Sequence, residues 1–155
     1  MRRRLAREMA VQSLYHMEMN AVDPLTAVRT SVDEAQDENE GGIRQADEVI
    51  SPDIVLELVE GTEKYRLAID ELLQNYLKGW HIDRLSKVDR QILRLAVYEL
   101  LFREDVPPKV VINEAIELAK HFGSDESGKF VNGVLGKLIH ELDDVKQRIG
   151  VKTEQ

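Results

Sequence analysis

Hydrophobic residues along this chain recur every three or four positions, the spacing that places side chains on one face of a helix. No segment of the sequence alternates apolar and polar residues as a half-buried strand does. The helical spacing covers residues 5–20, 24–35, 52–78, 87–103, 108–122 and a last stretch from 125 to beyond 142. The connector 80–86 has room for one further turn. The pattern predicts an all-α protein of six to seven helices built from packed bundles.

Prolines and small polar residues mark where these helices begin and end. Asp23-Pro24 and Ser51-Pro52 each place a capping residue before a proline at the first helical position. Pro107-Pro108 ends one helix and can open the next. Gly123 closes that helix, and Ser124 is suited to cap the one that follows.

The helix expected at 87–103 is predicted to lie at the centre of the core. Ten of the fifteen residues from Val88 to Phe102 are apolar, so only a narrow side can face water. In the helices that begin at Pro24 and Pro52, the inward-facing positions are expected to include Leu25 and Ile54.

Composition limits the kind of protein this is. The 155 residues suffice for one domain with its own core, expected at 1–150, followed by a polar tail at 151–155. The absence of cysteine excludes disulfides, thiolate nucleophiles and cysteine-ligated metals. No apolar run approaches the roughly 20 residues of a membrane span, and no signal-peptide core follows the N-terminus. We therefore expect a cytoplasmic protein with no membrane contact.

The charge is unevenly distributed. The net charge of −8 by itself argues against a nucleic-acid partner. However, residues 18–60 contain twelve acidic and two basic residues, while the rest of the chain contains 17 acidic and 19 basic residues. The acidic stretch 33–48, which includes Gly41-Gly42, is predicted to be a mobile loop. The N-terminal arm, residues 1–7, is strongly basic.

No motif in the chain indicates an enzyme. Gly123, Gly128 and Lys129 have the spacing of a phosphate-binding P-loop, but Phe130 replaces the Ser or Thr that such a loop needs. A helix is also expected before it, where a P-loop follows a strand. The four histidines form no metal-binding motif, and no Gly-x-Ser-x-Gly sequence occurs. We expect no catalytic residue, no metal and no cofactor.

Two features could bind RNA. The first is a group of arginines in the N-terminal arm: Arg2, Arg3, Arg4 and Arg7. They are either a solvated basic terminus or contacts to an RNA backbone, because a guanidinium can bind phosphate oxygens and stack on bases.

The second feature is Lys129-Phe130, in the first turn of the last helix. A cation beside an aromatic ring at a helix N-terminus can hold a phosphate and stack a base. The alternative, which the residues alone favour for Phe130, is that its ring packs in the core with Val134.

Along almost all its length, the chain resembles the bacterial NusB family of transcription antitermination factors. The matching segments are RRLAREMAVQSLY at 3–15, VDRQILRLAVYEL at 88–100, VPP at 106–108, INEAIELAK at 112–120, FG at 122–123 and KFVNGVL at 129–135. Segment 22–51 matches least.

The resemblance implies two packed helical subdomains and a non-enzymatic adaptor. It implies binding to single-stranded boxA RNA of ribosomal RNA operons, in a heterodimer with NusE, a small-subunit ribosomal protein. It also implies a role in the RNA polymerase antitermination complex, and some members of the family form homodimers. By the resemblance, the N-terminal arginines, Lys129 and Phe130 contact RNA, and Glu126 and Ser127 border that surface.

Two other functions remain open at this point. One is a helical protein–protein interaction module with no RNA binding of its own. The other is part of an RNA-modifying enzyme, because NusB-like domains also precede ribosomal RNA methyltransferase domains. No glycine-rich cofactor-binding unit follows in this sequence, which disfavours the enzyme.

Overall fold

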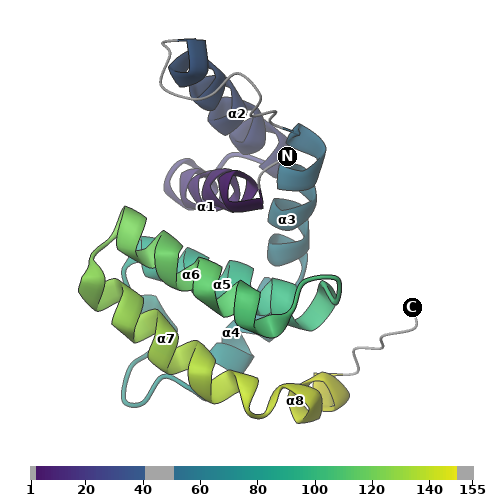
Figure 1. Ribbon diagram of the computed structural model, residues 1–155, viewed down its shortest axis with the longest axis vertical. Coiled ribbons are helices and arrows are strands. Elements are labelled where there is room, and N and C mark those ends of the chain that lie inside the picture. The colour runs from purple at the N-terminus through teal and green to yellow at the C-terminus, as the bar shows by residue number, and fades with distance from the viewer. Residues whose placement is uncertain (1–2, 41–50, 150–155) are drawn as a thin grey trace. The chain divides into compact units, whose positions relative to one another are not determined.

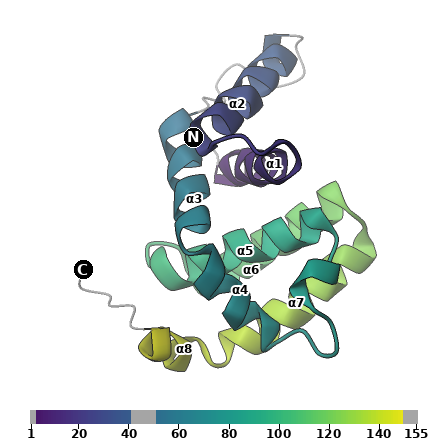
Figure 2. The same ribbon diagram turned by 180° about the vertical axis from the view of Figure 1, so that it is seen from behind.

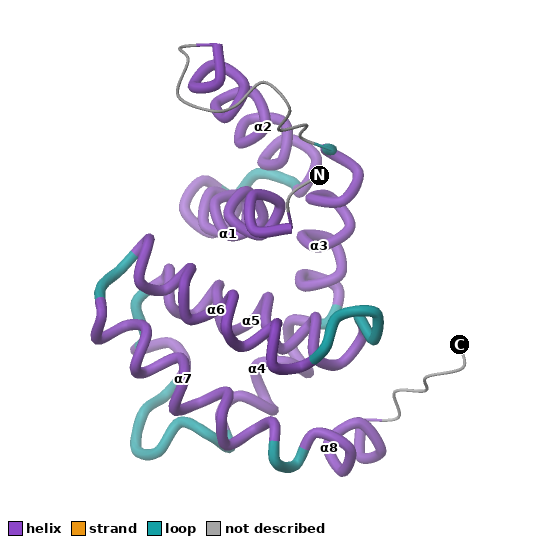
Figure 3. The backbone as a smooth tube through the Cα atoms, in the orientation of Figure 1, coloured by secondary structure: helices purple, strands orange, loops and turns teal. Residues whose placement is uncertain are grey.

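A computed structural model describes residues 3–40 and 51–149, and the side chains of 4–35 and 51–149. Within those ranges it contains eight α-helices, one 3-10 helix and no strand (Figures 1 and 3). The all-α prediction is therefore confirmed, with slightly more helices than the six to seven expected. The helices divide into two compact units, Met1–Glu63 and Lys64–Gln155. In the described part of the chain, no helix is both long and apolar enough to cross a membrane.

The first unit contains α1 (Arg3–Asn20), α2 (Pro24–Glu40) and α3 (Pro52–Lys64). Helices α1 and α2 pack against each other. Ser13 of α1 donates its hydroxyl hydrogen to the carbonyl of Met9, and its Oγ lies 3.1 Å from that of Ser31 in α2. Helices α2 and α3 begin at the prolines that the sequence indicated. The inward positions predicted for Leu25 and Ile54 are wrong, since both side chains are exposed in the first turns of their helices.

The acidic stretch 33–48 differs from its prediction over its first part. Helix α2 continues to Glu40, so residues 33–40 are helical rather than a loop. The charged side chains of Asp33 and Glu34 are exposed, and Ala35 is buried, which is the pattern of an amphipathic helix. The remaining part of the predicted loop, 41–48, lies outside the described residues, as does the predicted tail 151–155.

The second unit is built around α5 (Lys87–Phe102). This helix contacts α4 (Arg66–Gln74), α6 (Pro108–Phe122), α7 (Asp125–Ile139) and α8 (Leu142–Ile149). Every residue from Arg90 to Leu101 is buried, which confirms that α5 is the central helix. The predicted short turn is the 3-10 helix η1 (Ile82–Arg84), which leads directly into α5 (Figure 2).

The long helix predicted from Pro52 is interrupted at Tyr65. This residue has φ −103° and ψ 14°, outside the helical region, and it separates α3 from α4. Its ring stacks on Phe102 with centroids 4.2 Å apart, and Phe102 also contacts Tyr98 at 5.5 Å. Periodicity in the sequence carries no sign of this break, because the three- and four-residue spacing continues through Tyr65 to Ile69 and Leu72.

The last predicted helix is also divided. Helix α7 ends at Ile139, and α8 begins at Leu142 and contacts α5. The Tyr76 hydroxyl donates a hydrogen bond to the Glu141 carboxylate between the two helices. Lys146 of α8 lies 3.5 Å from Glu104, just beyond the end of α5. The division therefore turns the last helix back toward α5 and buries Leu142.

Candidate nucleic-acid interface

Arg3, Arg4 and Arg7 are part of α1 rather than an extended arm. The helix begins at Arg3, whose side chain lies outside the described residues, as does all of Arg2. Arg4 is exposed, whereas the side chain of Arg7 is only 4% exposed. Both Arg4 and Arg7 have interaction partners within the protein. Among the N-terminal arginines, Arg4 is therefore the one whose side chain the structure describes as exposed, and Arg29 of α2 is a further exposed arginine of the first unit.

The burial of Arg7 departs from its predicted place on the RNA surface. The cause is helical geometry, because residues three, four and seven positions further on share its face. These residues are Ala10, Val11 and Leu14, and all three are buried. A signal for this was present in the sequence, since Ala10, Val11 and Leu14 are apolar and stand at helical spacing from Arg7.

Lys129 and Glu126 lie in the first turns of α7 and are both well exposed. The Lys129 side chain is 77% exposed, and its Nζ lies 3.7 Å from Oε1 of Glu126. An exposed pair of this kind contributes only about 0–1 kcal/mol, since water solvates both charges. The ammonium group can therefore exchange Glu126 for a phosphate oxygen at little cost.

Phe130 and Ser127 sit beside these two residues. Phe130 is half-buried, so neither a fully buried core role nor a fully exposed ring describes it. The Ser124 hydroxyl accepts a hydrogen bond of 3.2 Å from the backbone N–H of Ser127, which confirms Ser124 as the N-cap. The cap fixes the first turn of α7, and with it the direction in which Lys129 and Phe130 leave the helix.

A fifth residue, Lys120, joins this site from the end of α6. Gly128 is buried, and a Cβ atom at Gly128 would lie 3.0 Å from Cγ and 3.3 Å from Cε of Lys120. The missing side chain therefore lets the aliphatic stem of Lys120 lie across α7. Its ammonium group is 3.8 Å from the Glu117 carboxylate, again a weak exposed pair. Lys120 was not predicted from the sequence, because only the packing of α6 on α7 brings it here.

We call Lys120, Glu126, Ser127, Lys129 and Phe130 the α6–α7 corner. The corner is joined to the start of α5, since the Ser127 hydroxyl lies 3.4 Å from Oδ2 of Asp89. Asp89 is also part of a helix cap, because its backbone N–H donates to the Ser86 hydroxyl at 3.1 Å. The first turns of α5 and α7 therefore lie next to each other.

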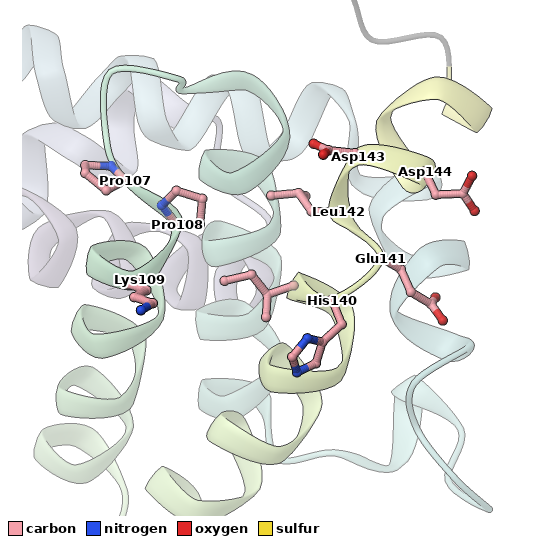
Figure 4. A pocket seen from close by; sticks show the side chains of 9 residues that line it. Pro107, Pro108, Lys109, His140, Glu141, Leu142, Asp143 and Asp144 are labelled. Carbon is pink, nitrogen blue, oxygen red and sulfur yellow. The ribbon is translucent and has the colours of Figure 1, made fainter.

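A cavity of about 660 Å³ lies at the other end of α7. Pro107, Pro108 and Leu142 form apolar walls, and the carboxylates of Glu141, Asp143 and Asp144 lie on the side away from the prolines (Figure 4). Lys109 and His140 are the basic side chains of the lining. Because carboxylates outnumber them, the cavity does not favour phosphate.

The described residues contain no group of three or more His, Asp or Glu side chains that could hold a metal ion. The segment that resembled a P-loop follows helix α6, not a strand. The Glu117 carboxylate pairs with Lys120. The chemistry of the α6–α7 corner is that of exposed cations beside an aromatic ring.

Comparison with known proteins agrees with this architecture. The sequence matches the NusB family over residues 4–140. It is 44% identical over 147 residues to the transcription antitermination protein NusB of Desulfitobacterium hafniense, covering 92% of this chain and 91% of that protein.

Solved structures of related proteins have the same fold. The T. maritima NusB structure is 34% identical, covers 95% of this chain and 92% of its own, and has a TM-score of 0.72. A crystal structure of antitermination factors NusB and NusE in complex with dsRNA matches with a TM-score of 0.69 and 28% identity, covering 94% of this chain and 96% of that one. The family match over most of the chain and these relatives lead to one conclusion: this chain belongs to the NusB family.

Proposed function

We propose that this protein is a non-enzymatic transcription antitermination factor that binds RNA. Its ligand is the boxA element of ribosomal RNA operon transcripts, which it binds as a heterodimer with NusE. Within the antitermination complex of RNA polymerase it promotes read-through of ribosomal RNA genes, a role exercised in the cytoplasm. Self-association to a homodimer is an alternative state of the same protein.

The observation that carries the proposal is the α6–α7 corner. Lys129 and Lys120 are exposed cations held only by weak pairs, and Phe130 offers a half-exposed ring beside them. Single-stranded RNA is bound by this combination, since cations neutralise phosphates and aromatic rings stack on splayed bases. Glu126 and Ser127 border the surface: Glu126 releases Lys129 to a phosphate, and Ser127 keeps the turn in place.

The N-terminal arginines supply further phosphate contacts in this proposal. Arg4 is exposed on α1, and Arg2 and Arg3 precede it in the chain. Arg7 belongs to the same predicted group, but its contact with RNA requires the side chain to leave its buried position. We therefore assign the contact first to Arg2, Arg3 and Arg4.

The experiment is an RNA-binding titration with three RNAs of equal length, each with and without NusE. The RNAs are a boxA-like single strand, a scrambled single strand and a duplex, because the related solved complex contains double-stranded RNA. We expect the boxA-like strand to bind most tightly, and more tightly with NusE. Equal binding of all three RNAs would contradict boxA recognition, and no binding even with NusE would remove the RNA role.

Two variants test the corner itself. Phe130→Ala is expected to weaken binding by about 1–3 kcal/mol if the ring stacks on a base. Lys129→Ala is expected to reduce the slope of log K against log salt by about 0.7 for a single strand. Lys109→Ala is the matched control, because Lys109 is an exposed lysine of the same unit in the first turn of α6. Circular dichroism must show that Phe130→Ala still folds.

An interaction module without RNA binding remains the second candidate. Tyr15 and Met19, four residues apart on α1, are exposed apolar side chains, and Leu25 is a third at the start of α2. Exposed apolar groups of this size suit a protein partner. If the protein is only an interaction module, Tyr15→Ala and Met19→Ala should weaken NusE binding. The wild type should then show no binding in any of the RNA titrations.

A further inference from the structure

The segment between α4 and α5 carries an exposed aromatic ring among basic residues. Trp80 is 57% exposed, which is unusual for the largest apolar side chain. Lys78, Arg84 and Lys87 flank it in the sequence, and all three are exposed. Within the described residues these three cations have no hydrogen-bond or ion-pair partner. The nearby carboxylate of Asp83 is paired with His81 at 3.4 Å.

The backbone of this segment is held firmly from the inside. The Gln74 amide donates a hydrogen bond of 2.6 Å to the carbonyl of Trp80 and accepts one of 3.0 Å from the N–H of Ile82. The buried guanidinium of Arg90 donates from Nη1 to the carbonyls of Ile82, Asp83 and Leu85 at 3.3–3.4 Å. Gly79 has φ +72°, a left-handed conformation that glycine adopts without strain.

These contacts order the segment without covering the indole ring. An ordered, exposed aromatic ring binds a flat ligand with less loss of conformational entropy than a mobile one. The burial of apolar surface explains the positions of Ile82 and Leu77, but it does not explain why Trp80 faces water.

The segment adjoins the α6–α7 corner. Lys87 is the first residue of α5, and Asp89 two positions later contacts Ser127 in the first turn of α7. Lys87 of α5 and Lys129 of α7 therefore lie near adjoining helix ends, and η1 lies between Trp80 and Lys87 in the chain.

We propose that Trp80, Lys78, Arg84 and Lys87 form a second contact for single-stranded RNA that extends the path beyond the α6–α7 corner. A base stacks on the indole ring, and the three cations bind the phosphates on either side of it. Aromatic stacking tolerates any base, so this contact adds affinity and RNA length rather than sequence preference. The inference rests on the proposed function, because it concerns the same RNA ligand.

Trp80 is the only tryptophan of the chain, so its fluorescence reports on this contact directly. The full-length protein is titrated with boxA-like single strands of about 8 and about 16 nucleotides, in the range bound by one single-strand-binding domain. We expect the longer RNA to quench Trp80 emission saturably, at the same concentrations at which it binds. Trp80→Ala is expected to bind the longer RNA about tenfold more weakly and the shorter one as the wild type does.

Three further variants make the test specific. Trp80→Phe keeps a stacking ring and should recover most of the affinity lost in Trp80→Ala. Leu67→Ala is the matched apolar control, because Leu67 is 76% exposed in the same unit. Arg84→Ala should reduce the salt slope for the longer RNA by about 0.7, with no change for the shorter RNA.

The outcomes separate this inference from the proposed function. If neither RNA binds the wild type, with or without NusE, the proposed function fails. If the longer RNA binds while Trp80 emission and the affinity of Trp80→Ala stay unchanged, the second contact is wrong and the proposed function stands. If emission changes only when NusE is added without RNA, the surface binds protein, which also overturns the inference.

Discussion

The guanidinium of Arg94 and the carboxylate of Asp70 face each other through two parallel hydrogen bonds. Nε donates to Oδ1 and Nη2 to Oδ2, each at 2.8 Å. The Arg94 side chain is 8% exposed, so this pair joins α4 to α5 with little water around it. Planar bidentate geometry makes such pairs stronger and more specific than ordinary surface pairs.

Asp70→Ala should destabilise the second unit by about 3 kcal/mol, because it leaves the buried Arg94 charge without its carboxylate. Urea unfolding followed by Trp80 fluorescence measures this, since Trp80 lies in the same unit. Asp83→Ala is the control and should change the unfolding free energy by less than about 0.5 kcal/mol, because Asp83 pairs only at the surface. Equal unfolding midpoints for Asp70→Ala and the wild type would show that the pair contributes nothing.

The Tyr76 hydroxyl predicts a loss of stability at high pH. Burial, followed by the hydrogen bond to the Glu141 carboxylate, raises the pKa of Tyr76 to about 12. In the unfolded chain this pKa is about 10, so the folded state favours the protonated hydroxyl. The stabilisation is complete below about pH 10 and is lost as the pH rises toward 12.

Tyr76→Phe should remove this part of the pH dependence and cost about 1 kcal/mol at neutral pH, the usual value of one hydrogen bond. Urea midpoints of both proteins across the alkaline range provide the measurement. The difference between them should shrink as the pH approaches 12. A difference that stays constant with pH would mean that Tyr76 does not titrate differently in the folded state.

Two glycines of the α6–α7 region should respond oppositely to alanine. At Gly133, in the middle of α7, an added Cβ meets nothing within 4 Å. Gly133→Ala should therefore stabilise the protein by about 0.5–1 kcal/mol, because alanine favours the helix. At Gly123 a Cβ would lie 2.6 Å from the Ser127 hydroxyl and 2.9 Å from the carbonyl of Ala119.

Gly123→Ala should consequently destabilise the protein by about 1–3 kcal/mol, since a backbone atom must move to make room. Thermal unfolding of the two variants side by side decides between them. A Gly133→Ala variant that is no more stable than the wild type would contradict this prediction. It would mean that the added Cβ disturbs close packing around α7.

The sequence predicted those features that depend on neighbouring residues in the chain. Ser124 as a cap, Pro108 as the first residue of a helix and the central place of the helix at 87–103 are all local or periodic properties. The stacking of Tyr65 on Phe102 was missed, and so was the approach of Lys120 to Gly128 of the next helix. Both are contacts between helices, and periodicity contains no information about which helix packs on which.

Arg7 provides the sharpest test of the N-terminal arginines, because burial and the predicted RNA contact lead to different results. If the Arg7 side chain stays buried when the protein binds RNA, Arg7→Ala should lower the unfolding free energy by about 2–3 kcal/mol. This is the cost expected when a buried charged group is removed from its partner. Arg4→Ala, one turn earlier and exposed, should change stability by less than about 0.5 kcal/mol. It should weaken RNA binding and reduce the salt slope by about 0.7, because one phosphate contact is lost.

Denaturation and RNA titration are measured on both variants, with the titration done at a temperature where each remains folded. Under those conditions folded Arg7→Ala should retain more RNA affinity than Arg4→Ala. The opposite pattern, unchanged stability with an affinity loss as large as that of Arg4→Ala, would mean that the Arg7 side chain leaves the helix interior to bind phosphate. The predicted four-arginine contact would then be correct, and the buried position would belong to the RNA-free protein.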